Sequence, residues 1–201
     1  MSKGRVIDKS KLINVLLEYK EKLLIEKLNY KELDISNLED VAIVKEVSEF
    51  DTSKKCFGDY SLFDDFDYYT NYAIYFENEL IGFLGYTESH PKDTTRIIPC
   101  LCIKEKYRNI GIGYIIINQL LNNVFEYYDD IKSIYLTIIE NNIPSIRLAK
   151  SLGFYGFPGY RENDYIQVNG TLEKQNHYLY KRKDYEKNKK EHLPYGDMKF
   201  K

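Results

Sequence analysis

The chain has 201 residues, 43% of them hydrophobic and 30% charged, with a formal net charge of −2. This length allows one domain with a well-formed core, and the balanced charge excludes a general attraction to nucleic acid or to an anionic membrane. No apolar run approaches the roughly 20 residues of a membrane span, and the first residues lack the apolar stretch of a secretory signal. Three cysteines without a Cys-x-x-Cys pair, together with three histidines, argue against a disulfide framework and against a metal site. We therefore expect a cytoplasmic protein that needs no metal.

The N-terminal segment, residues 8–28, predicts an amphipathic helix. Its apolar residues Leu12, Leu16, Tyr19 and Leu23 recur at helical spacing. We expect this helix to pack on its own domain. The alternative is that it forms a contact in a homodimer or a lid over a site.

The remaining elements follow from apolar periodicity and from turn and cap residues. Strands are expected at 28–35, 72–76, 80–86, 97–103, 134–139, 165–168 and 177–180. Helices are expected at 38–47 and 114–128 and from Pro144 to just before Gly153, with a loop over 155–160. The chain is thus divided into an N-terminal helical extension (1–28), one α/β domain (29–183) and a charged C-terminal tail (184–201).

A loop with two glycines, Arg108 to Gly113, joins an apolar strand to a long helix. Glycine permits positive φ and close approach of the backbone, and the unpaired N–H groups of a helix's first turn bind phosphate. A dinucleotide fingerprint is excluded because Ile116 stands where its third glycine is needed. A P-loop is excluded because Tyr114 and Ile115 follow the second glycine instead of Lys and Ser or Thr. The loop reads Arg-x-x-Gly-x-Gly.

A second motif follows the strand at 134–139. Its pattern, Asn-x-x-Ser-x-x-Leu-x-x-x-x-Gly-Phe, is carried by Asn142, Ser145, Leu148, Gly153 and Phe154. Together with the glycine loop about thirty residues earlier, it resembles the GNAT acetyltransferases, and it is similar to the branch that acetylates the N-termini of ribosomal proteins. The resemblance implies an α/β fold with a mixed, mostly antiparallel sheet flanked by helices, to which the N-terminal helix is an addition.

The resemblance also implies an N-acetyltransferase that moves an acetyl group from acetyl-CoA to an amine by direct attack. In this family two strands separate and the pantetheine arm lies between them, where the backbone of Leu101, Cys102 and Ile103 would bind its amides and polarise the thioester carbonyl. Asn142 would bind the arm from the other side, and Arg147 or Lys150 could meet the CoA phosphates. The pyrophosphate would be bound by the backbone of Arg108, Asn109, Ile110, Gly111, Ile112, Gly113 and Tyr114.

The proton transfers are less well defined by the sequence. Many GNAT members protonate the departing thiolate with a Tyr four residues before the Gly of the Gly-Phe pair, and this chain has Ala149 there. Ser145 is the nearest hydroxyl and the candidate acid, with capping or lining of the helix as the alternative. Glu88 and Glu140, at strand ends, are the candidate bases, although carboxylates at such positions are often simply solvated.

The acceptor is expected to be a cationic amine, because carboxylates and aromatic residues are interleaved over 59–69 and aromatic residues recur over 155–164. A small molecule such as a polyamine or an aminoglycoside, or a protein N-terminus, would fit. A covalent acyl-enzyme on Cys100 or Cys102 is disfavoured, since a cysteine in a strand usually packs as a small apolar residue. The alternative function is a catalytically weak GNAT-fold module that binds CoA and acts as a sensor or binds a partner.

Overall fold

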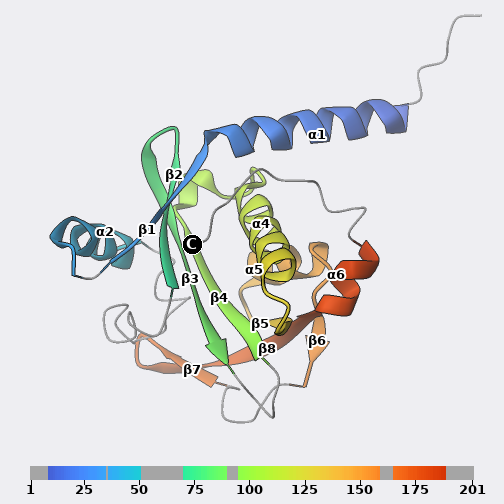
Figure 1. The fold of residues 1–201 in the computed structure, drawn as a ribbon. Coiled ribbons are helices and arrows are strands. Elements are labelled where there is room, and N and C mark those ends of the chain that lie inside the picture. Colours follow the sequence, from blue (N-terminus) through green and yellow to red (C-terminus); the bar gives the residue numbers. More distant parts are fainter. Residues whose placement is uncertain (1–8, 35, 51–69, 90–94, 159–164, 189–201) are drawn as a thin grey trace, which may run out of the picture.

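The computed structural model describes residues 9–34, 36–50, 70–89, 95–158 and 165–188 (Figure 1). The strands are β1 Leu28–Glu32, β2 Thr70–Phe76, β3 Glu79–Ser89, β4 Thr95–Ile103, β5 Ile131–Ile139, β6 Tyr155–Phe157, β7 Tyr165–Val168 and β8 Thr171–Lys181. The helices are α1 Lys9–Lys27, α2 Leu38–Ser48, α4 Ile112–Tyr127, α5 Ile143–Ser151 and α6 Arg182–Asn188, with a 3-10 turn, η3, over Glu105–Tyr107.

The strands form one mixed sheet in the order β1-β2-β3-β4-β5-β8-β6, and β7 pairs with β8 beside it. Every described pair is antiparallel except β4 with β5. These two run parallel because the chain crosses over between them through α4. The mixed, mostly antiparallel sheet flanked by helices confirms the fold class predicted from the sequence.

Helices cover both faces of the sheet and create two cores. Because side chains alternate along a strand, neighbouring residues belong to different cores. Ile74 and Leu84 lie in the larger core with the buried residues of α4 and α5. Ala73 and Phe83 lie in the smaller core with Val44 of α2. The two sequence motifs, the glycine loop before α4 and the pattern carried by α5, therefore lie on the α4 and α5 side of the sheet.

The predicted N-terminal helix is present, but its contacts differ from the predicted stripe. Leu24 and Ile25 pack against the larger core, whereas Leu17, Tyr19 and Leu23 are exposed. Figure 1 shows α1 as a straight helix that passes near the start of α4 and runs on past the domain. Only the last turns of α1 therefore have a surface to pack on in the described part of the chain.

The C-terminal strands differ from the prediction in extent and pairing. The segment Tyr155–Phe157, expected to be a loop, forms β6, because β8 offers it an edge to pair with. β8 begins at Thr171 instead of 177. Its first residues form the hairpin with β7, and its later residues pair with β5 and β6. One long strand thus serves three neighbours, which a local sequence pattern does not reveal.

The beginning of the predicted tail is instead the helix α6, which is fixed to the end of α4. Arg182 donates from Nε to the Ile131 carbonyl at 2.9 Å and from Nη1 to the Phe125 carbonyl at 2.6 Å, and its Nη2 donates to the Tyr128 carbonyl. The guanidinium thus satisfies carbonyls where α4 ends and β5 begins, as cations at helix C-termini do. Tyr185 is buried beside them.

Candidate active site

β4 and β5 are paired only at their beginnings. The ladder ends where Ile97 pairs with Ile134, although both strands continue for several residues. Pro99 follows two residues later and, having no N–H, cannot donate to a ladder. The two parallel strands therefore separate, in the way that the resemblance implied.

A cavity of about 160 Å³ lies at this separation. It is lined by residues 98–101 of β4, by residues 136–139 of β5 and by one side of α5. Most of the lining is apolar, and its polar side chains include Thr137, Asn142 and Ser145. A narrow space of this kind suits an extended, thin ligand that is held by a few polar contacts.

The loop before α4 has the geometry predicted for an anion site. Gly111 is the N-cap of α4 and has φ +104°, a conformation that favours glycine. The first intrahelical bond runs from the Ile115 N–H to the Gly111 carbonyl at 3.1 Å. The N–H groups of residues 112–114 therefore have no acceptor within the helix, and a helix start of this kind binds anions.

The candidate anion site, which consists of the N–H groups of residues 112–114 at the start of α4, borders the cavity. A Cβ placed on Gly113 would lie 3.4 Å from Leu148 Cδ2 and 3.9 Å from Leu101 Cδ2, and both leucines line the cavity. A ligand with a phosphate group at one end could thus reach from the start of α4 into the space between the strands.

Arg108 stabilises the loop through hydrogen bonds to the segment that precedes it. Its N–H donates to the Glu105 carbonyl at 3.0 Å within the 3-10 turn, and its side-chain Nε donates to the Ile103 carbonyl at 2.8 Å. The N–H of Arg108, which the sequence assigned to phosphate binding, is therefore engaged in the turn. Of the predicted loop, the N–H groups of residues 112–114 have no acceptor within the helix.

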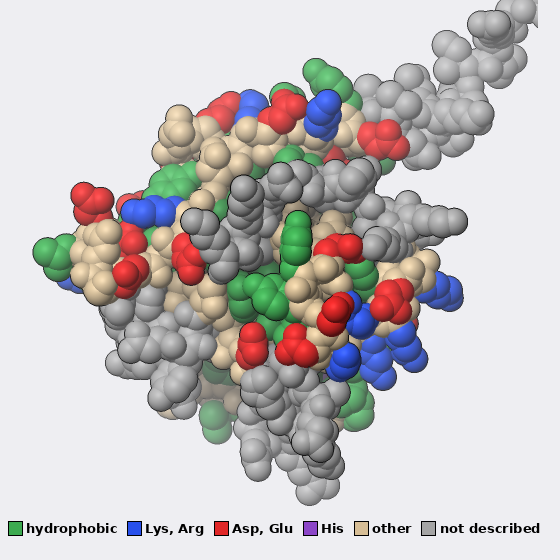
Figure 2. Space-filling model, viewed as in Figure 1, with side chains coloured by type: hydrophobic (Ala, Val, Ile, Leu, Met, Phe, Trp, Pro, Cys, Tyr) green, Lys and Arg blue, Asp and Glu red, His purple; other side chains and the backbone are tan. Residues whose placement is uncertain are grey.

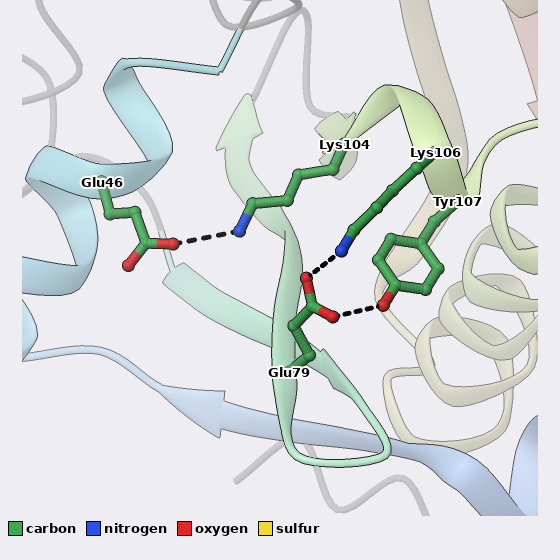
Figure 3. A network of polar contacts seen from close by, with 5 residues as sticks. All are labelled: Glu46, Glu79, Lys104, Lys106 and Tyr107. Carbon is green, nitrogen blue, oxygen red and sulfur yellow. Dashed lines mark hydrogen bonds and ion pairs between the residues drawn. The ribbon is translucent and has the colours of Figure 1, made fainter.

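Charged side chains fix the connection from β4 to this loop (Figure 3). Lys104 Nζ lies 3.0 Å from a carboxylate oxygen of Glu46 on α2. Glu79, at the start of β3, pairs with Lys106 and accepts a hydrogen bond of 2.6 Å from the Tyr107 hydroxyl. The hydrogen bonds from Lys106 and Tyr107 hold the pKa of Glu79 below its ordinary value. Each exposed contact is weak, but together they join the loop to α2 and β3.

The second motif brings Asn142 and Ser145 to the cavity. Asn142 is the N-cap of α5, and its Oδ1 accepts the Ser145 N–H at 3.4 Å. Both residues line the cavity. The Ser145 hydroxyl has no hydrogen-bond partner within the part of the chain that the structure describes, so it is available to a ligand.

The residues predicted to bind acetyl-CoA are only partly brought together. Leu101 lines the cavity, whereas Cys102 and Ile103 do not. Cys102 is fully buried and faces the α2 side, opposite Phe83 of β3. The cavity follows β4 from Ile98 to Leu101 because the strands separate immediately after Ile97. Arg147 lies on the exposed side of α5.

The two predicted bases do not line the cavity. Glu88 is exposed near the end of β3, and Glu140 is exposed after β5, where it pairs with Lys174 at 3.6 Å. The predicted acceptor segment 59–69 and residues 159–164 of the second segment, 155–164, lie outside the described residues. Residues Tyr155–Phe157 of the second segment form β6.

A buried polar pair near the cavity was missed by the sequence reasoning. The Tyr135 hydroxyl and His177 Nδ1 form a hydrogen bond of 2.5 Å, and their rings are stacked with centroids 5.7 Å apart. The available signal was a single histidine at the start of the predicted last strand, 177–180. Its partner could not be read from the sequence, because the two residues are 42 positions apart.

Charge is mixed on the face of the molecule that Figure 2 shows. Basic side chains gather where α6 lies, and side chains of both signs lie over α1 and α2.

The separated strands, the glycine loop and the start of α5 lie next to one another on one side of the sheet. The model of the acetyltransferase (GNAT) family matches residues 40–154, which include both motifs and the cavity. The chain therefore belongs to the GNAT acetyltransferase family, and it is an acetyl-CoA-dependent N-acetyltransferase.

Known proteins are similar to this chain in sequence and in structure. The spermine/spermidine N(1)-acetyltransferase of Bacillus subtilis is 31% identical over 114 residues, which are 54% of this chain and 72% of that protein. The spermidine N-acetyltransferase of Vibrio cholerae, solved in complex with CoA and spermine, superposes with a TM-score of 0.63 at 16% identity, covering 80% of this chain and 98% of that one. The ribosomal-protein-S5-alanine acetyltransferase of Vibrio fischeri superposes with a TM-score of 0.62 at 13% identity, covering 79% and 95%. The two structures show a shared fold.

The described residues lack two further features. No helix among them is long and apolar enough to cross a membrane. The same residues contain no group of three or more His, Cys, Asp or Glu side chains that could hold a metal ion.

Proposed function

We propose that this enzyme acetylates a primary amine of a small polycationic molecule of the polyamine type, by direct attack of the amine on acetyl-CoA. The observation that carries the proposal is the cavity between β4 and β5, which is bordered by the anion site at α4 and by Ser145 of α5. This arrangement offers one binding surface for the phosphates of the donor, one for its arm and one hydroxyl near the reacting end.

The cofactor would be held mainly by backbone groups. The N–H groups of residues 112–114 would bind the pyrophosphate, with Asn109, Ile110 and Gly111 shaping the loop around it. Leu101 and Asn142 would flank the pantetheine arm. The apolar lining suits the carbon chain of that arm, and the few polar side chains suit its amides.

Direct attack requires the acceptor amine to lose a proton and the departing thiolate to gain one. The nitrogen lone pair forms a bond to the acetyl carbonyl carbon, the C–S bond breaks, and its electron pair leaves on the CoA sulfur. Ser145 would donate the proton to that sulfur, which is the part that Tyr plays in many members of the family. Its hydroxyl suits this role because it lines the cavity without a partner among the described residues.

The polyamine is favoured as acceptor by the sequence similarity, since 31% identity extends over 114 residues to a protein named as a spermine/spermidine acetyltransferase. The protein N-terminus suggested by the second motif has weaker support, because the ribosomal-protein acetyltransferase is related only in fold, at 13% identity. A polyamine also presents the cationic nitrogen that the sequence predicted.

An acceptor panel tests this proposal. Release of CoA thiol from acetyl-CoA would be followed with spermidine, spermine, an aminoglycoside and a peptide with a free N-terminus, and products would be weighed by mass spectrometry. We expect kcat/KM for a polyamine to exceed that of the other amines by at least roughly tenfold, equivalent to about 1.4 kcal/mol. A preference for the peptide or the aminoglycoside would refute the assignment of the acceptor. Binding of CoA by calorimetry without thiol release for any amine would favour the weakly catalytic module instead.

A further inference from the structure

The positions of Glu88 and Glu140 do not identify the general base that deprotonates the acceptor. Neither carboxylate lines the cavity, yet the ammonium form of an amine acceptor must lose a proton before it can attack. The buried pair of Tyr135 and His177 supplies titratable groups on the strands next to the cavity.

His177 is a direct neighbour of a residue that lines the cavity. In the antiparallel ladder of β5 and β8, Thr137 is paired with His177. Directly opposite residues point to the same face with Cβ atoms about 4.5–5.5 Å apart. Thr137 itself lines the cavity, so this residue stands between the strand that carries His177 and the space available to a ligand.

Tyr135 and Phe157 hold the imidazole in place. The Tyr135 hydroxyl bonds to Nδ1 of His177, and Phe157 of β6 meets the Tyr135 ring edge-on at 6.2 Å. Both Tyr135 and His177 are buried. The described neighbours on this face are Tyr135, Thr137 and Ile139 from β5, Tyr155 and Phe157 from β6, and Gln175 and Leu179 from β8 itself. The titratable groups among these seven are Tyr135 and Tyr155.

We propose that His177, oriented by Tyr135, accepts the proton of the acceptor ammonium through the hydroxyl group of Thr137. This inference rests on the direct attack of the proposed function but not on the identity of the amine. With Nδ1–H donating to the Tyr135 oxygen, Nε2 keeps a lone pair that can accept a proton. Thr137 can donate to that nitrogen while it accepts from the ammonium, because a hydroxyl group is both donor and acceptor.

The protons balance over one turnover. The first proton leaves the ammonium, passes through Thr137 to His177 Nε2, and returns to solvent after the reaction. The amine then attacks the carbonyl carbon. A second proton leaves the same nitrogen as the tetrahedral intermediate collapses, and it ends on the CoA thiol.

The test is the dependence of kcat/KM on pH for His177→Gln and Thr137→Val, measured with whichever amine of the panel the wild-type enzyme uses. General base catalysis contributes roughly 10²–10⁴-fold, so both variants should lose at least about 100-fold at neutral pH. Their rates should rise with pH as the free amine becomes more abundant, without the acidic limb of a histidine. Affinity for CoA by calorimetry should be unchanged. Thr137→Ser, which restores the hydroxyl group, should recover most of the lost activity.

Tyr135→Phe tests the orienting contact. Loss of the phenol oxygen removes the hydrogen bond that orients the imidazole, so kcat should fall while KM and the affinity for CoA stay those of the wild type. Tyr185→Phe is the matched control, because it removes a buried phenol that bonds to Glu126 far from the cavity, and its pH profile should be that of the wild type. A wild-type acidic limb in His177→Gln, or wild-type kcat in Thr137→Val, would overturn the proposal. Rejection of polyamines by the wild-type enzyme would leave these measurements intact with another amine, so the two failures are distinct.

Discussion

Replacement of Gly111 by Ala tests the contribution of the backbone to the anion site separately from the contribution of side chains. Gly111 has φ +104° at the N-cap of α4, and a Cβ there would lie 3.7 Å from Leu24 Cδ1, an ordinary contact. The substitution therefore introduces no clash, and its cost is backbone strain of about 1–2 kcal/mol. Relief of that strain requires the loop to turn, which would redirect the N–H groups of residues 112–114.

The effect on the cofactor can be worked out from those groups. A hydrogen bond to a charged group contributes roughly 1.5–3 kcal/mol, so loss of one N–H from the phosphate should weaken CoA binding roughly 10- to 100-fold. The strain alone should lower the midpoint of thermal unfolding by about 2–8 °C, since 1 kcal/mol corresponds to about 2–4 °C in a domain of this size. Calorimetric titration with CoA and thermal unfolding followed by circular dichroism measure the two effects.

Gly170→Ala is the matched control. Gly170 has φ +74° in the turn between β7 and β8, and a Cβ there would meet nothing within 4 Å. It should show a similar loss of stability with unchanged affinity for CoA. If Gly111→Ala bound CoA like the wild type, or if both variants lost affinity equally, the role assigned to the start of α4 would be refuted.

Three further changes test other parts of the molecule. Ser145→Ala should lower kcat by roughly 10- to 100-fold while leaving CoA affinity unchanged, because it removes the proposed proton donor and no packing; an unchanged kcat in steady-state kinetics would return Ser145 to a lining role. Arg182→Met should lower the melting midpoint by about 5–10 °C, since charged donors to three carbonyls at the end of α4 are lost. The exposed neighbour serves as its control, and Lys183→Met should melt like the wild type. Buried Asp40 pairs with Lys31, and although burial acts to raise its pKa, the hydrogen bonds from Lys31 and a backbone N–H outweigh burial and lower it. A lowered folded pKa gives stability that is present above the unfolded pKa of about 3.9 and is lost as pH falls through the folded pKa. Asp40→Asn should therefore lower the urea midpoint at pH 7, and should show a smaller further loss on acidification than the wild type does.

The sequence predicted the elements whose signals are local. Asn142, Pro144 and Gly153 predicted α5, and the structure places them at its N-cap, in its first turn and after its last residue, with φ +90° at Gly153. Gly111 predicted a positive φ before α4 in the same way. Such residues act through their own backbone conformation, so their meaning does not depend on distant parts of the chain.

The sequence could not predict features that depend on register. The last two strands suggested a hairpin, and nothing in the sequence indicated that β8 also pairs with β5 and β6, which places His177 opposite Thr137. The sequence likewise did not show that β4 separates from β5 directly after Ile97. Because of this separation, residues 98–101 of β4 line the cavity, whereas residues 101–103 were predicted to bind the cofactor. Sheet order determines such neighbours, and nothing in a single strand's alternation specifies which strand will lie beside it.

The difference between the two halves of the site has a physical origin. Donor binding relies on backbone N–H groups, which every residue has, so only glycines and cap residues are needed and the sequence displays them. Proton transfer relies on side chains whose roles depend on what they meet across the sheet, and their positions become visible only when strands are paired. In the proposed site, α5 and β8 would supply the acid and the base, so the absence of the usual Tyr at Ala149 would leave the donor-binding half unaffected.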